Sequence, residues 1–489
     1  MSAPDRPAEQ PLPLASLGRV HLIGIGGAGV SVVARLLAAR GVPVQGSDAA
    51  ESPALAALRD DGVRVWVGHD AAHVVAPDGA TLADTVVVST AVRETNPELA
   101  AARAAGLRVL HRSQALASLM VGQRAIAVAG AHGKTTTSAM IATVLRASGT
   151  DPSFAIGGTV RLRGADGEVT AIPGGHLGAC DVLVAEADES DGSFLNYAPT
   201  VAVVTNVEPD HLDHYGTRDA FDAAFVGFAA RLQPGGVLVA CADDEGSATL
   251  AVAHRAGGGT SVTYGASADA DVVVADVTTT ADGAGATLSG GPLGAAPLPL
   301  RLCVPGAHNV LNATAAVVVA ALLGTAPADA VAAAQAFVGT GRRFEPRGAA
   351  GGVRVVDDYA HHPTEIEALL RAARPVAGEG RLLVLFQPHL YSRTRIFADR
   401  FAAALALADE VVVTGIYRAR EDVDPAVSAR TITGLLPATR SGGQVRAIED
   451  GREAAAAVAA TARPGDLVLT VGAGDVTELA PQILAALGA

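Results

Sequence analysis

The sequence of 489 residues contains a single lysine, and arginine supplies the other 35 of its 36 basic side chains. A GC-rich genome explains why lysine is scarce, but it does not explain where the one lysine lies. Lys134 follows Gly133 in the segment AIAVAGAHGKTTT, which covers residues 125–137. Arginine is too wide and planar to replace a compact ammonium inside a phosphate-binding loop. The retained lysine therefore predicts a contact with the β- and γ-phosphates of a nucleoside triphosphate.

Cysteines and aromatic residues are also scarce. The three cysteines, Cys180, Cys241 and Cys303, form no C-x-x-C motif, which argues against a disulfide framework and favours the cytoplasm. Aromatic residues make up 3% of the chain and hydrophobic residues 49%, so a large core must rest on alanine, valine and leucine. The formal net charge of −14 disfavours nucleic acid as a partner, because nucleic-acid-binding proteins present a basic face.

The sequence has no hydrophobic run that is long enough to cross a membrane. Residues 302–328 carry no Asp, Glu, Lys or Arg, but their continuous helical part spans only residues 313–323. A helix that crosses a bilayer needs about 20 apolar residues. We therefore expect a buried helix here and no integral membrane segment. The sequence does not distinguish a monomer from a homodimer.

The residues around Lys134 support a nucleotide site. Residues 125–129 form a short apolar run that predicts a buried parallel strand, and residues 135–147 predict a helix. Gly130 and Gly133 would let backbone N–H groups approach the phosphates, and the helix N-terminus adds the positive end of its dipole.

The loop departs from the full phosphate-loop pattern in one position. Position 128 is Val, so the motif is G-x-x-G-K-T, which is shorter than G-x-x-x-x-G-K-[ST]. The hydroxyl of Thr135 or Thr136 would hold Mg²⁺. An ordinary strand–turn–helix without a ligand is the alternative.

A second glycine-rich segment lies near the N-terminus. A predicted strand leads into G-x-G-x-x-G at Gly24, Gly26 and Gly29, a helix follows to Arg40, and Asp48 comes about 20 residues after the motif. This βαβ arrangement binds a nucleotide diphosphate and its ribose. Further strands are predicted at residues 63–67, 85–89 and 107–110. Their alternation with helical stretches predicts a parallel sheet.

The length and these motifs predict an α/β protein of three domains. A flexible tail is expected at residues 1–16, followed by a first domain at residues 17–122. A central domain around Lys134 would cover residues 123–340, and a third domain residues 341–489. Residues 257–299 are rich in Gly, Ala and Thr with alternating valines, which predicts a small antiparallel insertion in the central domain.

Acidic and histidine residues follow several predicted strands. Glu186 comes directly after the apolar strand at residues 182–185, where a carboxylate beside a phosphate loop is placed to hold Mg²⁺. A solvated loop acid is the alternative. His211 also follows a strand, although imidazole is an unusual ligand for Mg²⁺. His361 precedes another histidine and a proline, a pattern that is more often structural than catalytic.

Eight stretches of the chain resemble motifs of the bacterial Mur ligases, in the same order and spread over about residues 18–475. They favour the branch of that family that adds L-alanine to UDP-N-acetylmuramate. One such motif is a weak signal, whereas eight in register are highly specific. The stretches are Gly24–Gly29, Gly130–Thr136, Glu186–Asp191, Thr205–Asp213, His308–Asn312, Gly341–Glu345, Asp357–Pro363 and Phe386–Thr394.

The resemblance implies a Rossmann-like first domain that binds the uridine nucleotide and a central P-loop ATPase-like α/β domain. It implies a Rossmann-like third domain that closes over ATP and receives the amino acid. In the implied reaction, the lactyl carboxylate of UDP-N-acetylmuramate attacks the γ-phosphate of ATP and forms an acyl phosphate. The amine of L-alanine then expels phosphate and forms an amide for peptidoglycan synthesis, with ATP and Mg²⁺ as the implied cofactors.

The resemblance also implies roles for individual residues. Catalysis is assigned to Lys134, Glu186, His211, Arg343 and His361. ATP is assigned to Gly130, His132, Gly133, Lys134, Thr135, Thr136, His308, Asn309, Asn312 and Arg343. The uridine substrate and the alanine are assigned to Gly26, Gly27, Ala28, Ser31, Asp48, Ser89, Tyr359, His361 and Arg393. Metal ions are assigned to Thr135, Glu186 and His211.

Three other functions remain open. An NAD-dependent dehydrogenase would explain only the first glycine-rich segment. A non-catalytic sensor of UDP-sugars would have no need of Lys134, Glu186 and Arg343 together. The closest alternative is a cell-wall recycling ligase that attaches a whole peptide to UDP-N-acetylmuramate. Leu390 stands where many relatives have arginine, so one basic contact with the amino acid is expected to be missing or supplied elsewhere.

Overall fold

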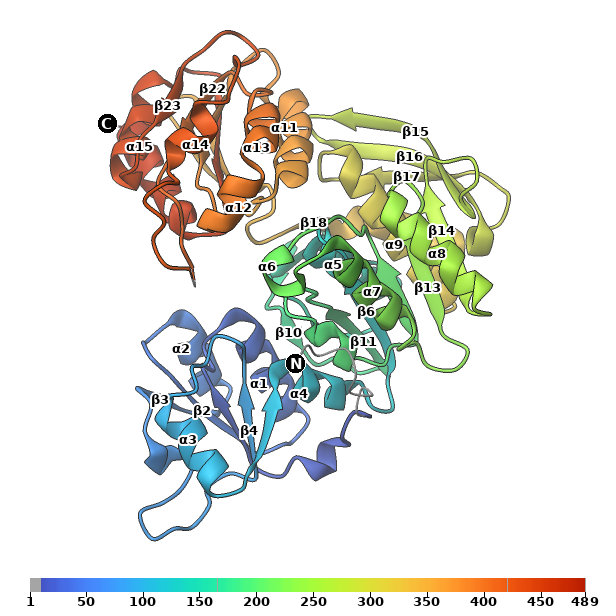
Figure 1. The fold of residues 1–489 in the computed structure, drawn as a ribbon. Helices are drawn as coiled ribbons and strands as arrows, with labels where there is room; N and C mark the ends of the chain where they lie inside the picture. The colour runs from blue at the N-terminus through green and yellow to red at the C-terminus, as the bar shows by residue number, and fades with distance from the viewer. Residues whose placement is uncertain (1–9, 165, 420, 489) are drawn as a thin grey trace.

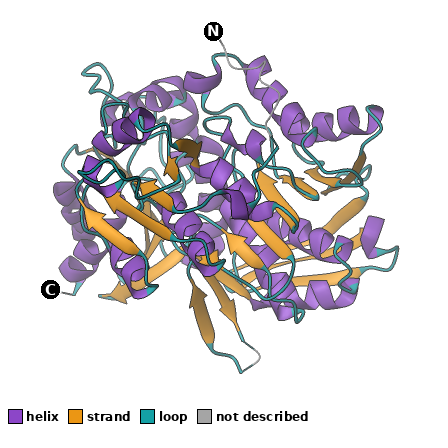
Figure 2. Ribbon diagram, turned by 90° about the horizontal axis from the view of Figure 1, so that it is seen from below, coloured by secondary structure: helices purple, strands orange, loops and turns teal. Residues whose placement is uncertain are grey.

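The structure, a computed structural model, describes residues 10–164, 166–419 and 421–488. It has three lobes: the first lies at the lower left of Figure 1, the central one at the centre and right, and the third at the upper left. Helices lie on both sides of the strands (Figure 2). The predicted α/β class with three domains is confirmed.

The first domain is a parallel sheet flanked by helices. Its strands are β1 (Val20–Ile23), β2 (Val44–Asp48), β3 (Arg64–Val67), β4 (Thr85–Val88) and β5 (Arg108–His111). Its helices are α1 (Ala28–Ala39), α2 (Pro53–Asp60), α3 (Pro97–Ala104) and α4 (Arg112–Met120). The strand order is β3-β2-β1-β4-β5, and every pairing is parallel, as predicted. The order reverses between β1 and β4, which is where such sheets bind ligands.

Glycine shapes the turn between β1 and α1. Gly24 has a φ of 74°, a left-handed conformation that favours glycine. A Cβ on Gly26 would overlap Leu55 Cδ1 of α2, so a larger residue there would force the Leu55 side chain to move. The N–H of Gly26 donates to Asp48 Oδ2 over 2.8 Å. This hydrogen bond holds the end of β2 beside the start of α1.

The central domain is built on one ten-stranded sheet. Its strands are β6 (Arg124–Ala129), β7 (Ser153–Ala155), β10 (Gly175–His176), β11 (Val182–Glu186), β12 (Val201–Val204), β13 (Val237–Cys241), β14 (Thr260–Gly265), β15 (Val272–Thr280), β16 (Gly283–Gly290) and β17 (Leu298–Leu302). Their order is β10-β7-β11-β6-β12-β13-β14-β15-β16-β17. The helices are α5 (Lys134–Ala147), α6 (Leu212–Tyr215), α7 (Arg218–Ala229), α8 (Glu245–Ala256), α9 (Ala307–Leu322) and α10 (Pro327–Ala333).

The antiparallel strands do not form the separate insertion predicted at residues 257–299. β16 is antiparallel to both β15 and β17, as expected. However, β14 pairs in parallel with β13, and β15 pairs in parallel with β14. These strands therefore extend the central sheet. Alternating valines predict local pairing, but they do not show whether an edge strand joins another sheet.

A three-stranded antiparallel sheet lies beside the central one. It consists of β8 (Val160–Arg163), β9 (Val169–Ile172) and β18 (Phe337–Thr340), in the order β18-β8-β9. The β8–β9 hairpin projects from the body of the molecule (Figure 2). Because β18 directly precedes the third domain, its pairing fixes where that domain starts.

The third domain has a mostly parallel six-stranded sheet in the order β19-β20-β24-β21-β22-β23, in which only the β19–β20 pair is antiparallel. The strands are β19 (Glu345–Ala350), β20 (Val353–Asp358), β21 (Leu382–Phe386), β22 (Glu410–Val413), β23 (Val445–Ala447) and β24 (Leu467–Val471). The helices are α11 (Pro363–Ala377), α12 (Tyr391–Ile396), α13 (Ala398–Leu405), α14 (Ala429–Thr433), α15 (Gly451–Thr461) and α16 (Ala480–Leu487).

The core rests on alanine, valine and leucine, as the composition requires. Helix α9 is the predicted buried helix, and it begins at Ala307, earlier than the expected residue 313. Its added first turns carry His308, Asn309 and Asn312. No helix of the described residues is long and apolar enough to span a membrane.

Part of the predicted flexible tail is packed against the first domain. Residues 1–9 of the predicted tail lie outside the described residues. Beyond them, Leu12 and Leu14 pack against the hydrophobic core, and residues Leu14–Ser16 form a short 3-10 helix. The limits at residues 17–122, 123–340 and 341–489 stay a prediction.

Candidate active site

The loop between β6 and α5 is shaped to bind an anion. Gly130 and Gly133 have φ angles of 134° and 81°. A Cβ on Gly130 would lie 2.1 Å from Thr205 Oγ1, so glycine is required there. Gly133 precedes α5 and provides no side-chain cap. The N–H groups of the first helical turn therefore face the loop without an intrahelical acceptor, at the positive end of the helix dipole.

The ammonium of Lys134 is folded back over this loop. Nζ donates to the carbonyl oxygens of Gly130 (2.7 Å) and Ala131 (3.3 Å) and to Glu189 Oε1 (2.9 Å). Burial would lower the pKa of Lys134, but the carboxylates of Glu189 and Asp188 raise it above its ordinary value. The side chain therefore stays charged.

Glu189 is a buried partner of Lys134 that sequence reasoning missed. Burial raises the pKa of its carboxyl to about 7, and Lys134 offsets this only in part. The hydroxyl of Tyr215 donates to the Glu189 carbonyl oxygen over 2.5 Å. The ammonium can exchange the carboxylate for phosphate oxygens because both are anionic acceptors.

The residues expected to hold metal line one cavity with Lys134. Thr135 Oγ1 donates to Glu186 Oε1 over 2.9 Å, and Glu186 Oε2 accepts from the N–H of Gly157 over 2.9 Å. His211 Nε2 lies 3.8 Å from Glu189 Oε1. Burial lowers the pKa of His211, which keeps its imidazole neutral, and its buried Nδ1 has no hydrogen-bond partner. The hydroxyl and carboxylate oxygens fit Mg²⁺, and the neutral imidazole is free to act as a ligand.

A cavity of about 270 Å³ lies between α9 and α11 on one side of the loop. It brings together seven of the residues expected to bind ATP: His132, Gly133, Thr136, His308, Asn309, Asn312 and Arg343. Hydrogen bonds fix the two asparagines. Asn312 Oδ1 accepts from Thr137 Oγ1 (3.1 Å), and Asn309 Nδ2 donates to the Pro305 carbonyl oxygen (2.7 Å). Burial and the charge of Arg343 lower the pKa of His308 to about 4.

A larger cavity of about 670 Å³ lies on the other side of the loop and is lined by all three domains. The first domain contributes Ala28, Gly29 and Arg112. The central domain contributes Lys134, Thr135, Glu186, Asp188, Asp210 and His211, and the third contributes Arg343, Tyr359, His361, His389, Leu390 and Arg393. Gly133, Arg343 and Glu365 line both cavities, so the two meet at the Lys134 loop.

Arg343 joins the third domain to the loop. Its guanidinium carbon lies 5.2 Å from the ring centroid of Tyr359, and Nη1 lies 3.5 Å from Glu365 Oε1. Burial would lower the pKa of Arg343, but the carboxylates of Glu365 and Asp358 raise it. The site therefore contains a second permanent positive charge beside Lys134.

The residues predicted to bind alanine lie together at the far end of the larger cavity. Arg393 Nη2 donates to both oxygens of Asp210, at 2.8 and 3.0 Å, and the pair is buried. His361 Nδ1 lies 3.0 Å from the Tyr359 carbonyl oxygen, and burial lowers the pKa of this histidine to about 3. The ring is neutral, so Nδ1 donates to the carbonyl and leaves Nε2 as an acceptor.

The residues predicted to bind the uridine nucleotide do not all line one cavity. Ala28 and Ser31 line a third cavity of about 220 Å³ together with Gly157 and Gly158 of the central domain. Ser89 directly follows β4 and lines none of these three cavities.

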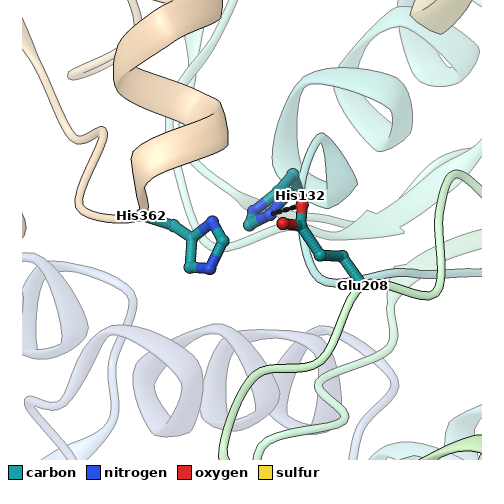
Figure 3. Close-up of side chains that lie close together, drawn as sticks. All are labelled: His132, Glu208 and His362. Atoms are coloured by element: carbon teal, nitrogen blue, oxygen red, sulfur yellow. Dashed lines mark hydrogen bonds and ion pairs between the residues drawn. The ribbon is translucent and has the colours of Figure 1, made fainter. Parts of the chain in front are cut away.

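His132, the histidine of the phosphate loop, faces the third domain. Its Nε2 lies 3.1 Å from Glu208 Oε2, and its ring centroid lies 4.5 Å from that of His362, as Figure 3 shows. Burial would lower the pKa of His132, but the carboxylates of Glu208 and Glu365 raise it to about 9. The loop is thus in contact with α11 through charged and aromatic groups.

Comparison with known proteins identifies the family. Three family models match: the Mur ligase family catalytic domain at residues 19–124, the Mur ligase middle domain at residues 128–320, and the Mur ligase glutamate ligase domain at residues 342–474. The chain is 59% identical over 472 residues to the UDP-N-acetylmuramate–L-alanine ligase of Kineococcus radiotolerans, which covers 96% of both chains. The chain belongs to the Mur ligase family.

Solved structures of Mur ligases share the whole architecture. The UDP-N-acetylmuramate–alanine ligase of Thermotoga maritima matches with a TM-score of 0.75 at 30% identity, over 96% of this chain and 98% of that one. A murein peptide ligase of Psychrobacter arcticus matches with a TM-score of 0.69 at 25% identity, over 96% and 99%.

Several charged residues of this Mur ligase site were missed from sequence. Asp188, Glu189 and Asp210 lie inside motifs that carry the family resemblance, so proximity to Glu186 and His211 was a usable signal. Arg112 had no such signal. It begins α4 of the first domain and reaches the central domain, where Nη2 lies 2.6 Å from Asp188 Oδ2.

Proposed function

We propose that this Mur ligase joins L-alanine to the lactyl carboxylate of UDP-N-acetylmuramate and converts ATP to ADP and phosphate. The observation that carries the proposal is the meeting of two cavities at the Lys134 loop. One has the size and lining for a nucleoside. The other reaches from the first domain to the third, as a ligase that joins two substrates requires. The full-length relatives named for this reaction support the same assignment.

ATP is assigned to the smaller cavity, with its phosphates at the loop. Asn309 and Asn312 are held by hydrogen bonds to each other, to the Pro305 carbonyl oxygen and from Thr137, so the second N–H of each amide and the spare lone pairs can contact the base and ribose. The N–H groups at the start of α5 face the phosphates. We place the reaction in the cytoplasm, which supplies ATP and agrees with the three free cysteines.

The first chemical step brings together two anions, the lactyl carboxylate and the γ-phosphate. Catalysis must therefore neutralise charge and align the reacting atoms. Lys134 and Arg343 provide positive charge from two domains, and the dipole of α5 adds to it. Mg²⁺, held by Thr135 and Glu186 with His211 beside a second ion, would supply further charge at the phosphates and the carboxylate. Gly130 keeps the loop close enough for the backbone to contact the phosphates.

The second step needs a free amine at the carbonyl carbon of the acyl phosphate. Tyr359, His361 and Arg393 surround the place where alanine would enter from the third domain. Arg393 uses Nη2 for Asp210 and one N–H of Nη1 for His389 Nδ1 at 3.3 Å, which leaves the second N–H of Nη1 and the N–H of Nε for the alanine carboxylate. The neutral ring of His361 offers Nε2 as an acceptor toward the incoming ammonium.

The test is phosphate release from ATP and Mg²⁺ with UDP-N-acetylmuramate, to which L-alanine, glycine, L-serine or a tripeptide is added in turn. We expect release only when the uridine substrate and L-alanine are both present. A preference for the tripeptide would assign the chain to the recycling ligases. Tight binding of the uridine substrate without release for any acceptor would leave a sensor, and reduction of NAD would indicate a dehydrogenase.

A further inference from the structure

His132, Glu208 and His362 form a compact group, here called the junction cluster, where the central and third domains meet (Figure 3). His132 belongs to the phosphate loop, Glu208 follows β12, and His362 immediately precedes α11. One ligand atom from each residue lies within 4.8 Å of the other two. The proposed reaction gives none of these three side chains a metal to bind.

His362 is the unusual member of the cluster. Its side chain is fully buried, and the ring faces the backbone N–H of Glu365 at the start of α11, but neither Nδ1 nor Nε2 forms a hydrogen bond of normal geometry among the described residues. The ring packs against two aromatic rings, those of Phe397 at 4.9 Å and His132 at 4.5 Å between centroids. A buried polar group without a partner is costly and uncommon, so it calls for a ligand.

The other two residues are oriented as metal ligands are. The carboxylate of Glu208 accepts from Thr364 Oγ1 at 2.8 and 2.9 Å and from Arg400 at 2.6 Å. His132 turns Nε2 toward Glu208, while Nδ1 lies 3.6 Å from Glu365 Oε1. Histidine ligands commonly have a carboxylate behind the nitrogen that does not bind the metal.

We propose that the junction cluster binds Zn²⁺ and that the bound ion bridges the central and third domains. Two imidazoles and one carboxylate are a known ligand set for Zn²⁺, with a fourth position left for water. Small side-chain rotations must bring the three atoms to bonds of about 2.0–2.2 Å. His132, which the carboxylates of Glu208 and Glu365 keep protonated, must release the proton on Nε2 to solvent when the ion binds. The site differs from the proposed Mg²⁺ positions at Thr135 and Glu186, which offer oxygen atoms.

The proposed Zn²⁺ site draws its ligands from two domains. His362 comes from the third domain, and the other two ligands come from the central domain. The cluster is therefore complete only while the third domain lies against the phosphate loop. Bound Zn²⁺ holds that arrangement, so it slows any step in which the third domain must move away from the loop.

The test is a calorimetric titration of chelator-treated, full-length protein with ZnCl₂ in excess Mg²⁺ and without substrates. His211→Ala is present throughout, because it removes the imidazole nearest the other metal positions. We expect one Zn²⁺ per chain. His362→Ala should weaken binding by more than the roughly 10–100-fold that follows loss of an outer-shell partner. The matched control His254→Ala removes a histidine of α8 and should leave binding unchanged.

Equal Zn²⁺ affinity with and without His362→Ala would overturn the proposal. If that variant does not fold, the unsubstituted cluster is measured with CoCl₂. We then expect an intense visible absorption band that saturates at one equivalent and disappears when Zn²⁺ is added, because four-coordinate Co²⁺ absorbs strongly. Absence of a saturable band would also overturn it. Both measurements omit ATP and the uridine substrate, so their outcome is independent of the proposed ligase reaction.

A second readout is the radius of gyration in solution. Zn²⁺ alone should compact the His211→Ala protein, and His362→Ala should abolish that compaction. An unchanged radius with one Zn²⁺ bound would contradict the bridging role.

Discussion

Two groups of histidine and glutamate, one in the first domain and one between the central and third domains, differ in how completely their polar atoms are hydrogen-bonded. The first, here called the Glu98 cluster, consists of His21, Ser47, His73 and Glu98 in the first domain. The second is the junction cluster of His132, Glu208 and His362. Both combine a carboxylate with two imidazoles. Only one of them is confined to a single domain.

Every polar atom of the Glu98 carboxylate is bonded within its own domain. Oε2 accepts from Ser47 Oγ at 2.5 Å and contacts His21 Nε2 at 3.1 Å, and Oε1 contacts His73 Nδ1 at 2.6 Å. Burial would raise the pKa of Glu98, but the hydrogen bonds from His21, Ser47 and His73 lower it to about 2. The carboxylate is ionised and fully satisfied.

In the junction cluster, by contrast, some polar side-chain atoms form no hydrogen bond within the described residues. Glu208 is bonded by side chains of the third domain, whereas within the described residues neither ring nitrogen of His362 forms a hydrogen bond of normal geometry. The two clusters show that composition alone does not assign a role. A closed network within one domain stabilises the fold, whereas an open one between domains can respond to a ligand or to domain movement.

The largest expected effect is on stability, from Glu98→Ala. The substitution removes the only anion from a buried set of hydrogen-bonded histidines, so it should lower the free energy of unfolding by about 3–5 kcal/mol. Chemical denaturation measures this loss. The matched control is Glu94→Ala, whose side chain is 72% exposed. It should change the free energy by less than about 0.5 kcal/mol. Similar losses for both variants would show that the Glu98 cluster is not a stabilising network.

Lys134→Arg should produce the opposite result, a loss of turnover with little loss of stability. Arginine keeps the charge beside Glu189, but its planar head does not fit between the loop carbonyls and the phosphates. We expect kcat for phosphate release to fall roughly 100–1000-fold, as when one transition-state contact is removed. Arg255→Lys on α8 is the control and should retain turnover. Near-normal turnover of Lys134→Arg would refute the assigned role.

The difference between the clusters also explains what could be predicted from the sequence. The parallel strands and the Lys134 loop follow from local patterns, such as the apolar run before Gly130 and the helix that follows. Glu186 and His211 were predicted because each follows a strand at the same edge of one sheet, whereas their neighbours Asp188, Glu189 and Asp210 were missed.

Contacts between domains could not be predicted in that way. Arg112 lies 76 positions before Asp188, and Arg393 lies 183 positions after Asp210. No periodicity or motif spacing encodes such a pair, because it depends on how two finished domains sit against each other. The segment at residues 257–299 was predicted only in part for the same reason: its antiparallel pairs are local, but the parallel pairing of β14 with β13 of the central sheet arises only in three dimensions.

Low pH should remove the stabilising effect of the Glu98 cluster. The pKa of Glu98 is lowered from 4.5 to about 2. Its stabilising effect is therefore present above about pH 4.5 and is lost as the pH falls toward 2. We expect the free energy of unfolding to decrease over this range, and the decrease should be smaller in Glu98→Gln, which cannot ionise. Parallel pH profiles for the two proteins would contradict the pKa assignment.

The smallest expected effect is on domain closure, from Thr364→Val. The change preserves shape but removes the hydrogen bonds from Thr364 Oγ1 to Glu208, while Arg400 and His132 remain in contact with that carboxylate. One hydrogen bond contributes about 1 kcal/mol. The concentration of ATP analogue that half-compacts the protein in small-angle scattering should therefore rise roughly fivefold. Thr279→Val, on the exposed part of β15, is the control and should leave this midpoint unchanged. If Thr364→Val instead lowered the free energy of unfolding and left the midpoint unaltered, the junction would be part of the static core, and it would resemble the Glu98 cluster in role as well as in composition.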